Sequence, residues 1–426
     1  MPVINVLVFP AGEQNSIELH DALCSCVNIK LFGASSAGRE RHGSYIFENY
    51  ISGLPLITSP VFLDAFNAIL EQNKIDAVFP THDTVVQYFA DNANLIHAKI
   101  IGAGKETAAI CRDKKKIYET FREYAFIPDT YEKITHFPVF IKPREGQGAV
   151  GAKALFCTED IPQNINLDEY VVCEYLPEEE YTVDCFTDRH GQLLFVSPRS
   201  RERLLAGICV SGSTEKVTAE IKNIAETINS KLRFLGLWYF QIKKDGNEVF
   251  KLLEISARTA GTICLTRARG INLPLLSVYA VMGYDVEIPA NQYTVMMDRA
   301  LIARYKINYE YDTVYFDFDD TLIIRGKVNL SAIRFLYQCK NKNKQVILLT
   351  RHEKNIYESM KKYAINEDLF SEIINVGETG KKSAFVNREK AVFVDNAYSE
   401  RKDVYNVCKI PAFDVDGIEV LMDWRM

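Results

Sequence analysis

The residues whose types and spacing point most directly to chemistry are a lysine and three glycines. Lys142 ends an apolar run, and Gly146, Gly148 and Gly151 follow it, all three inside six residues. Glycine lets the backbone turn with its N–H groups exposed, which suits a polyphosphate, and the lysine supplies a compact positive charge. The pattern predicts a phosphate-binding loop, although a plain β-hairpin with a flexible tip fits it equally well. No Gly-Lys-Ser/Thr follows, so the motif is not a Walker P-loop.

Two further polar residues, Gln241 and Glu254, interrupt two apolar runs that are joined by Asp245-Gly246. Asp-Gly between such runs predicts a β-hairpin. The hairpin would place an amide oxygen and a carboxylate on neighbouring strands. Mg²⁺ accepts one or two such protein ligands beside substrate phosphates, so the pair is predicted to hold magnesium.

Three arginines stand at alternate positions, Arg199, Arg201 and Arg203. In one strand they would project from the same face. Guanidinium groups bind phosphate and carboxylate through paired hydrogen bonds, so this face is predicted to attract an anion.

A second chemical centre lies in the last third of the chain, where Asp317, Asp319 and Asp320 follow a buried strand-like run. Crowded carboxylates repel one another unless a cation lies among them, and Mg²⁺ with a phosphorylated substrate would meet that need. An acidic helix cap is the alternative. Three later groups complete the pattern: Thr350, one of Lys381 or Lys382, and Asp395.

The first hundred residues predict the scaffold for such groups, because short apolar runs alternate with helix-like segments. The runs are 3–9, 28–33 and 77–80, and the helix-like segments cover 17–23, 60–72 and 84–92. This alternation predicts a Rossmann-like, parallel doubly wound α/β sheet. Ligands of such sheets bind at the carboxyl ends of the strands, which makes the turns 10–16 and 80–84 predicted substrate contacts. Helix capping by Ser16 and Asp83 explains these turns equally well. A further helix is predicted from Arg112 to about residue 124.

In this order, the elements resemble an ATP-grasp ligase of the carbamoyl-phosphate-synthetase-like group, preceded by a Rossmann-like domain. The resemblance covers residues 1 to about 300 and implies a pre-ATP-grasp domain at 1–104 and an ATP-grasp domain at 105–305. It implies that ATP phosphorylates a small-molecule carboxylate and that an amine attacks the acyl phosphate. An ATP-grasp kinase acting without ligation and a non-catalytic nucleotide sensor remain the alternatives.

The resemblance also implies roles for single residues. For ATP, Lys114 and Lys142 would contact the phosphates, and a loop with Gly146, Gly148 and Gly151 would cover them. Glu174 and the backbone near Leu176 would hold adenine, and Glu180 would contact ribose. For the reaction, the roles are the Mg²⁺ ligands Gln241 and Glu254 and phosphoryl-group contacts from Arg258 and Arg201. Such families usually carry Glu-x-Asn where this chain has Glu254-Ile-Ser256. Ser256 therefore coordinates the metal directly, coordinates it through water, or leaves one metal position weakened.

Residues 311–426 resemble the haloacid dehalogenase superfamily, most of whose members are Mg²⁺-dependent phosphatases. The resemblance implies that Asp317 is the nucleophile and Asp319 the general acid and base. It places Asp317, Asp319 and Asp395 at the metal, and Thr350 with Lys382, preferred over Lys381, at the phosphoryl group. Asn396 stands where many members carry a second aspartate. The intervals between the motifs leave no room for a large cap domain, so a bifunctional enzyme with an open phosphatase site is expected.

Composition agrees with an ordinary globular enzyme of two or three domains. The chain has 426 residues, 47% hydrophobic and 25% charged, and a formal net charge of −6, which argues against a nucleic-acid binder. No apolar run has membrane-spanning length and the start lacks the basic flank of a signal peptide, so no membrane partner and a cytoplasmic location are expected. Small molecules are the expected partners, and homo-oligomerisation stays open. The ten cysteines lack zinc spacing and are predicted to be buried free thiols.

Overall fold

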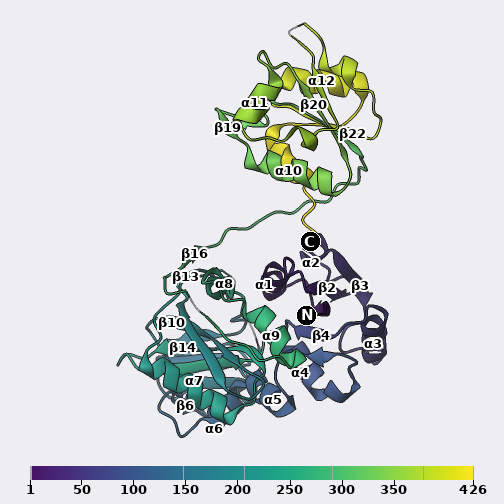
Figure 1. The fold of residues 1–426 in the computed structure, drawn as a ribbon. Coiled ribbons are helices and arrows are strands. Elements are labelled where there is room, and N and C mark those ends of the chain that lie inside the picture. Colours follow the sequence, from purple (N-terminus) through teal and green to yellow (C-terminus); the bar gives the residue numbers. More distant parts are fainter. Residues whose placement is uncertain (1, 147, 206, 290, 378, 426) are drawn as a thin grey trace. The chain divides into compact units, whose positions relative to one another are not determined.

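The computed structural model describes residues 2–146, 148–205, 207–289, 291–377 and 379–425. The chain divides into two compact units, an N-terminal unit up to residue 301 and a C-terminal unit of residues 302–425 (Figure 1). The predicted boundary at residues 104–105 lies inside the N-terminal unit and stays a prediction.

The N-terminal unit begins with a five-stranded parallel sheet in the order β3-β2-β1-β4-β5. The strands are β1 (Ile4–Phe9), β2 (Ile29–Ser36), β3 (Asn49–Leu54), β4 (Ala77–Pro80) and β5 (Lys99–Ile100), and the helices are α1 (Gln14–Leu23), α2 (Gly43–Ile46), α3 (Phe62–Gln72) and α4 (Asp83–Asp91). Phe9, Phe66 and Phe89 pack together in its core. The predicted parallel doubly wound sheet is confirmed. Strand β3 was missed because its residues are mostly polar or small and partly exposed.

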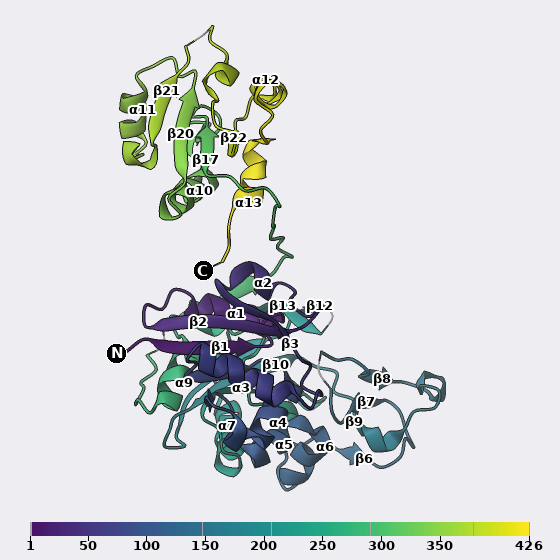
Figure 2. The ribbon, with the colours of Figure 1, turned by 90° about the vertical axis from the view of Figure 1, so that its right-hand side faces the viewer.

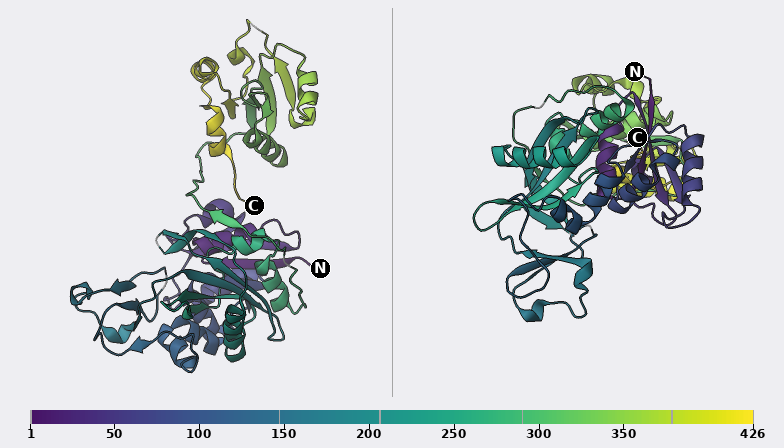
Figure 3. Two further views of the ribbon diagram at one scale, coloured as in Figure 1. Left: turned by 90° about the vertical axis from the view of Figure 1, so that its left-hand side faces the viewer. Right: turned by 90° about the horizontal axis from the view of Figure 1, so that it is seen from below.

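Antiparallel sheets form the rest of this unit. One has the order β6-β9-β7-β8, with β6 (Thr130–Tyr131), β7 (Val139–Pro143), β8 (Lys153–Leu155) and β9 (Tyr170–Glu174). A larger one has the order β11-β10-β14-β15, with β10 (Glu180–Thr187), β11 (Leu193–Ser200), β14 (Gly236–Lys244) and β15 (Phe250–Ser256). A small one joins β12 (Arg203–Leu205), β13 (Ile208–Ser213) and β16 (Met296–Asp298). The β6-β9-β7-β8 sheet protrudes at one end of the unit (Figures 2 and 3).

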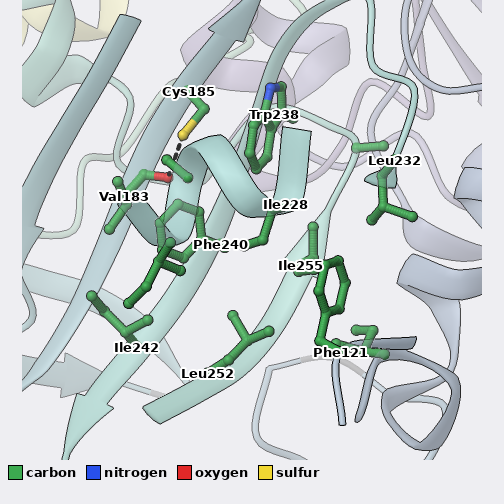
Figure 4. Close-up of a cluster of buried hydrophobic side chains, with 14 of the residues drawn as sticks. Phe121, Val183, Cys185, Ile228, Leu232, Trp238, Phe240, Ile242, Leu252 and Ile255 are labelled. Atoms are coloured by element: carbon green, nitrogen blue, oxygen red, sulfur yellow. Dashed lines mark hydrogen bonds between the residues drawn. The ribbon is translucent and has the colours of Figure 1, made fainter. Parts of the chain in front are cut away.

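The larger antiparallel sheet is covered by α7 (Ala219–Lys231), whose apolar side packs on it. Ile228 of this helix lies in one cluster with Trp238 and Phe240 of β14 and Leu252 of β15 (Figure 4). Two further helices, α8 (Cys264–Ala268) and α9 (Leu273–Met282), follow β15. This packing fixes β14 and β15, the two strands that carry Gln241 and Glu254.

The predicted Asp245-Gly246 hairpin is confirmed. β14 and β15 are antiparallel, Gln241 lies opposite Glu254, and the Asp245 N–H donates to the Val249 carbonyl oxygen at 2.9 Å. The prediction that three arginines share one strand face is wrong. Strand β11 ends at Ser200, and Arg203 begins β12 in another sheet.

The single helix predicted from Arg112 to about residue 124 is also wrong. The structure has two helices, α5 (Lys105–Arg112) and α6 (Lys114–Thr120). Between them Asp113 is extended, its side chain accepts from the Lys115 N–H at 2.9 Å, and it forms an ion pair with Arg144. An aspartate that caps a helix ends the preceding one, because its backbone leaves the helical region.

The C-terminal unit is a second parallel sheet, in the order β21-β20-β17-β22-β23. Its strands are β17 (Thr313–Phe316), β20 (Gln345–Thr350), β21 (Glu372–Asn375), β22 (Ala391–Val394) and β23 (Ala412–Phe413), and β18 (Ile323–Ile324) pairs with β19 (Lys327–Val328). Its helices are α10 (Leu330–Asn341), α11 (Ile356–Lys362), α12 (Tyr398–Cys408) and α13 (Ile418–Leu421). The neighbouring strands β17, β20 and β22 bring Asp317, Thr350 and Asp395 to one edge.

Within the described ranges, no helix is long and apolar enough to cross a membrane. The ten cysteines are all free, as predicted, but the prediction that they are buried holds only for Cys173, Cys185, Cys209 and Cys339, and Cys157 is exposed.

Candidate active sites

A cavity of about 530 Å³ in the N-terminal unit gathers most of the predicted ligase residues. Eleven of them line it: Lys114, Lys142, Gly146, Gly148, Glu174, Leu176, Glu180, Arg201, Gln241, Glu254 and Arg258. Gly151 and Ser256 are not among the lining residues, and Gln147 of the predicted loop lies outside the described residues. Lys142 and Glu254, which come from different sheets, therefore face one space.

Lys142 is the most buried of the lysines that line this cavity, and it has no acidic partner among the described residues. Its side chain lies on β7, donates to the Leu253 carbonyl oxygen at 3.1 Å and sits over the Tyr118 ring at 5.1 Å. No carboxylate in the described part of the chain forms an ion pair with it. Burial lowers the pKa of Lys142, and the nearby Lys114 adds to that shift. A buried ammonium in this state is stabilised by any anion that reaches it.

Lys114 stands at the start of α6 and reaches the same space. Its ammonium donates to the Gly146 carbonyl oxygen at 3.4 Å. Lys243 of β14 also lines the cavity, a residue that the sequence did not single out. Among the described residues, neither lysine forms an ion pair with a carboxylate. Lys243 lies two residues after Gln241, so strand alternation placed it on the same face.

The predicted metal pair is part of a short polar chain. With its amide nitrogen turned to Glu254, Gln241 donates to Glu254 Oε1 at 3.3 Å and accepts from Arg201 Nη1 at 3.0 Å. Arg201 Nε lies 2.6 Å from Glu180 Oε1. Arg201, which was predicted to contact the phosphoryl group, thus forms an ion pair with Glu180, which was predicted to bind ribose.

Asp83, the first residue of α4, links this helix to the end of β15. Arg258 Nε and Nη2 donate to its two carboxylate oxygens at 2.8 and 2.9 Å, and the Ser256 hydroxyl donates at 3.1 Å. Burial opposes the charge on Asp83, but Arg258 and Ser256 hold the pKa of this carboxyl below its ordinary value. The turn 80–84 therefore reaches the cavity, its contact with substrate stays a prediction, and Ser256 bonds to a protein acid.

Arg199, also on the cavity wall, is held by the protein. It is buried and donates to both oxygens of Asp184, at 3.0 and 2.9 Å, and Thr266 donates to the same carboxylate at 2.7 Å. Arg203 pairs with Asp298. All three arginines predicted to attract an anion therefore have carboxylate partners, which leaves the lysines as the available cations.

The glycine loop touches the β12–β13 turn. A Cβ on Gly207 would lie 2.3 Å from the Gly148 carbonyl oxygen, and Gly207 has φ of +78°. Only glycine tolerates both conditions, so the two turns approach each other backbone to backbone over the cavity.

In the C-terminal unit, a cavity of about 780 Å³ is lined by Asp317, Asp319, Lys382 and Asp395. The buried Lys382 ammonium lies 2.6 Å from Asp317 Oδ1 and 2.6 Å from Asp395 Oδ2. Burial raises the pKa of both carboxyls, and Lys382 opposes that shift. Lys381 instead points outward, with 75% of its side chain exposed.

Two hydroxyls complete this edge. Thr321 donates to Asp317 Oδ2 at 3.1 Å and accepts from the Asn396 backbone N–H at 3.1 Å. Thr350, at the end of β20, is fully buried and its hydroxyl has no hydrogen-bond partner among the described residues.

The structure does not bring Asp319 into the group of Asp317 and Asp395. Its carboxylate faces His352 instead, 2.8 Å from Nδ1. Accordingly, no cluster of three or more His, Cys, Asp or Glu side chains arranged to hold a metal occurs in the described ranges.

Comparisons with known proteins agree with this fold. The profile of a family described as "ATP-grasp in the biosynthetic pathway with Ter operon" matches residues 166–301. A search of curated protein sequences found no significant match. Among solved structures, N5-carboxyaminoimidazole synthetase from Staphylococcus aureus in complex with ADP has a TM-score of 0.58 at 14% identity, covering 71% of this chain and 83% of that one.

Two other solved structures are similar. Biotin carboxylase from Campylobacter jejuni in a β,γ-ATP complex has a TM-score of 0.56 at 15% identity, covering 68% of this chain and 74% of that chain. L-amino acid ligase from Bacillus licheniformis has a TM-score of 0.52 at 13% identity, covering 66% and 75%. The chain thus contains an ATP-grasp domain within a mixed α/β architecture.

Proposed function

We propose that the N-terminal unit is an ATP-dependent carboxylate–amine ligase that works through an acyl phosphate. One observation carries the proposal: lysines that have no acidic partner among the described residues share a cavity with the cross-strand pair Gln241 and Glu254. Such lysines complement phosphate oxygens, and the ATP-grasp fold supports a nucleotide in this place. The cofactors are ATP and Mg²⁺.

The residues fit a nucleotide triphosphate. Lys142 and Lys114 would hold the phosphates, with the glycine loop above them, and the segment from Glu174 to Leu176 would receive adenine. Glu180 would bind ribose through Oε2, because Arg201 occupies Oε1.

Glu254 fits magnesium, since one carboxylate beside substrate phosphates suffices for this ion. The bound ion would offset phosphate charge near the reacting group. Gln241 and Ser256 stay predicted ligands, and each already bonds to a protein neighbour, Gln241 to Arg201 and Ser256 to Asp83.

The proposed reaction has two steps. An oxygen of the substrate carboxylate attacks the γ-phosphorus, the bond to the β-phosphate oxygen breaks, and ADP leaves with the electron pair. The amine nitrogen then attacks the acyl carbon, phosphate leaves, and the nitrogen gives up its proton to form the amide. Arg258, held by Asp83, would lie beside the phosphoryl group and stabilise its charge.

A panel of acids and amines with Mg²⁺ and ATP tests this proposal, with ADP, phosphate and amide measured together. Amine-dependent phosphate release with amide formation is expected. ADP with a stable phosphorylated product and no amide would identify a kinase. Mg·ATP binding by calorimetry without any ADP would identify a nucleotide sensor.

We further propose that the C-terminal unit is a Mg²⁺-dependent phosphatase of the haloacid dehalogenase type. The observation that favours it is Lys382 between Asp317 and Asp395, with the unpartnered Thr350 hydroxyl on the strand beside Asp317. Two carboxylates on neighbouring strands fit magnesium, which keeps several waters and would offset the phosphoryl charge when bound. Lys382 and Thr350 would orient the phosphoryl oxygens.

In this reaction Asp317 attacks the phosphorus of a phosphate monoester while the bond to the leaving oxygen breaks. Asp319 gives that oxygen a proton, and later takes one from the water that hydrolyses the aspartyl-phosphate. Asp317→Asn should abolish phosphate release from monoesters and leave ADP formation by the other unit unchanged. Unchanged monoester kinetics in this variant would refute the assignment. We place both reactions in one sequence, with the phosphatase acting on a substrate or product of the ligase.

A further inference from the structure

We infer that His352 is a positioning residue of the C-terminal site, which fixes the carboxylate of Asp319 for its proton transfers. The inference rests on the proposed phosphatase function. His352 lies outside the motifs that the sequence singled out. It stands two positions after Thr350, the last residue of β20, and β20 pairs with β17, the strand that Asp319 follows.

The contact between the two side chains is close. His352 Nδ1 lies 2.8 Å from Asp319 Oδ2 and 3.1 Å from Oδ1. The side chain of Asp319 is 54% exposed, whereas that of His352 is only 10% exposed. No other described side chain forms an ion pair with Asp319, so His352 is the group that limits its rotamers. A freely rotating carboxylate would leave the geometry that proton transfer needs for much of the time.

His352 is itself held from several sides, which a positioning role requires. Its Nε2 lies 2.7 Å from the Ser359 hydroxyl on α11. Its ring packs edge-on against Phe318, with centroids 5.1 Å apart. Its backbone carbonyl accepts from Asn375 Nδ2 at 2.7 Å, at the end of β21. Phe318 and Ser359 therefore hold the imidazole ring, and Asn375 holds the backbone of the same residue.

When Asp319 is ionised, its carboxylate can only accept, so the ring donates from Nδ1–H, and in the matching tautomer Nε2 accepts from the Ser359 hydroxyl. This arrangement satisfies both ring nitrogens. It also directs the Nδ1–H at Asp319 alone. The contact can therefore be tested with side chains whose amide takes the place of Nδ1 or of Nε2, but not of both.

The test uses two phosphate esters that differ in their need for a general acid. Nitrophenolate leaves as an anion, so p-nitrophenyl phosphate requires little proton donation, whereas phenyl phosphate requires the leaving oxygen to be protonated. In the 426-residue chain with Mg²⁺, His352→Ala should lower kcat for phenyl phosphate by about 10- to 100-fold and kcat for p-nitrophenyl phosphate by less than about threefold. The KM for both esters should change little.

Two replacements separate positioning from packing. His352→Asn keeps an N–H near the place of Nδ1 and should restore most of the phenyl phosphate rate. His352→Gln places its amide near Nε2 and should not restore it. Tyr357→Phe, at an exposed position of α11, is the control and should match the wild type.

The outcomes are distinct. Equal losses for both esters in His352→Ala, or rates that Asn and Gln restore alike, would overturn the inference while the phosphatase proposal stands. No phosphate release from either ester by the wild-type chain would overturn the phosphatase proposal and the inference with it.

Discussion

Lys142 and Lys382 are both buried lysines, with 6% and 3% of their surface exposed, but their surroundings differ. Lys382 lies between two carboxylates, whereas Lys142 meets a carbonyl oxygen and an aromatic ring. A buried charge without a counter-ion costs free energy of folding. A buried lysine between two carboxylates instead stabilises the fold, because the carboxylates would otherwise be buried without a counter-ion. The same residue type therefore has opposite effects on stability at the two sites.

Lys142→Met should weaken Mg·ATP binding by about 100-fold, because the phosphates lose a buried, charge-assisted contact. The same change should leave the unliganded chain as stable as the wild type or more stable by about 1 kcal/mol, since an unpaired buried ammonium is removed. Calorimetric titration and urea unfolding measure the two effects. Wild-type affinity in the variant would show that the nucleotide does not reach this lysine.

Lys382→Met should instead destabilise the C-terminal unit by about 3 kcal/mol, because Asp317 and Asp395 remain buried without a counter-ion. Lys381→Met is the matched control, since Lys381 is exposed, and should change stability by less than about 0.5 kcal/mol. Urea unfolding followed by circular dichroism compares the two. A control variant as unstable as Lys382→Met would contradict the assignment of the lysine.

At the scale of elements, the start of α4 and the end of β15 are joined, because Asp83 bonds to Arg258 and Ser256. Helix α4 follows β4 of the first parallel sheet, and β15 belongs to the large antiparallel sheet. Because both carboxylate oxygens are engaged, this link fixes the edge of one sheet against the other and closes one side of the cavity.

The link predicts a pH dependence of stability. The pKa of Asp83 in the folded chain is below its ordinary value of 3.8. The ion pair of Asp83 with Arg258 therefore stabilises the fold above pH 3.8, and this stabilisation is lost as the pH falls through the pKa that Asp83 has in the folded chain. Asp83→Asn should cost about 3 kcal/mol near pH 7, and the difference from the wild type should shrink below about pH 4. Urea unfolding at pH 7 and pH 3 measures this. A difference that stays constant with pH would contradict the ion pair.

Elements with a strong local pattern could be predicted from the sequence, and the hairpin at Asp245-Gly246 shows why. Its turn residues and alternating strands specify both the fold and the register that places Gln241 opposite Glu254. The pairing of Arg201 with Glu180 depends on three-dimensional neighbours, as does the contact of Ser256 with Asp83, 173 positions away. His352 was missed for the same reason, because its partner Asp319 lies 33 positions away, in the segment after β17.

At the scale of the whole molecule, each unit has a core of its own. Trp238 and Phe240 lie in a cluster of the N-terminal unit, and Phe316 and Phe335 lie in a cluster of the C-terminal unit. Units with separate cores unfold as separate cooperative transitions unless their interface is large and apolar. A ligand then stabilises only the unit that binds it.

The 426-residue chain should therefore show two thermal transitions that respond to different ligands. Mg·ATP at 100 times its Kd should stabilise one unit by about 2.7 kcal/mol, which raises that transition by several degrees and leaves the other in place. A phosphate mimic such as tungstate with Mg²⁺ should raise only the other transition. Lys142→Met, with Mg·ATP affinity about 100-fold lower, should reduce the first stabilisation to about 0.4 kcal/mol, and Asp317→Asn should abolish the second shift, as scanning calorimetry would record. A single transition that both ligands raise would show that the two units unfold together, and the two sites would then be linked in stability.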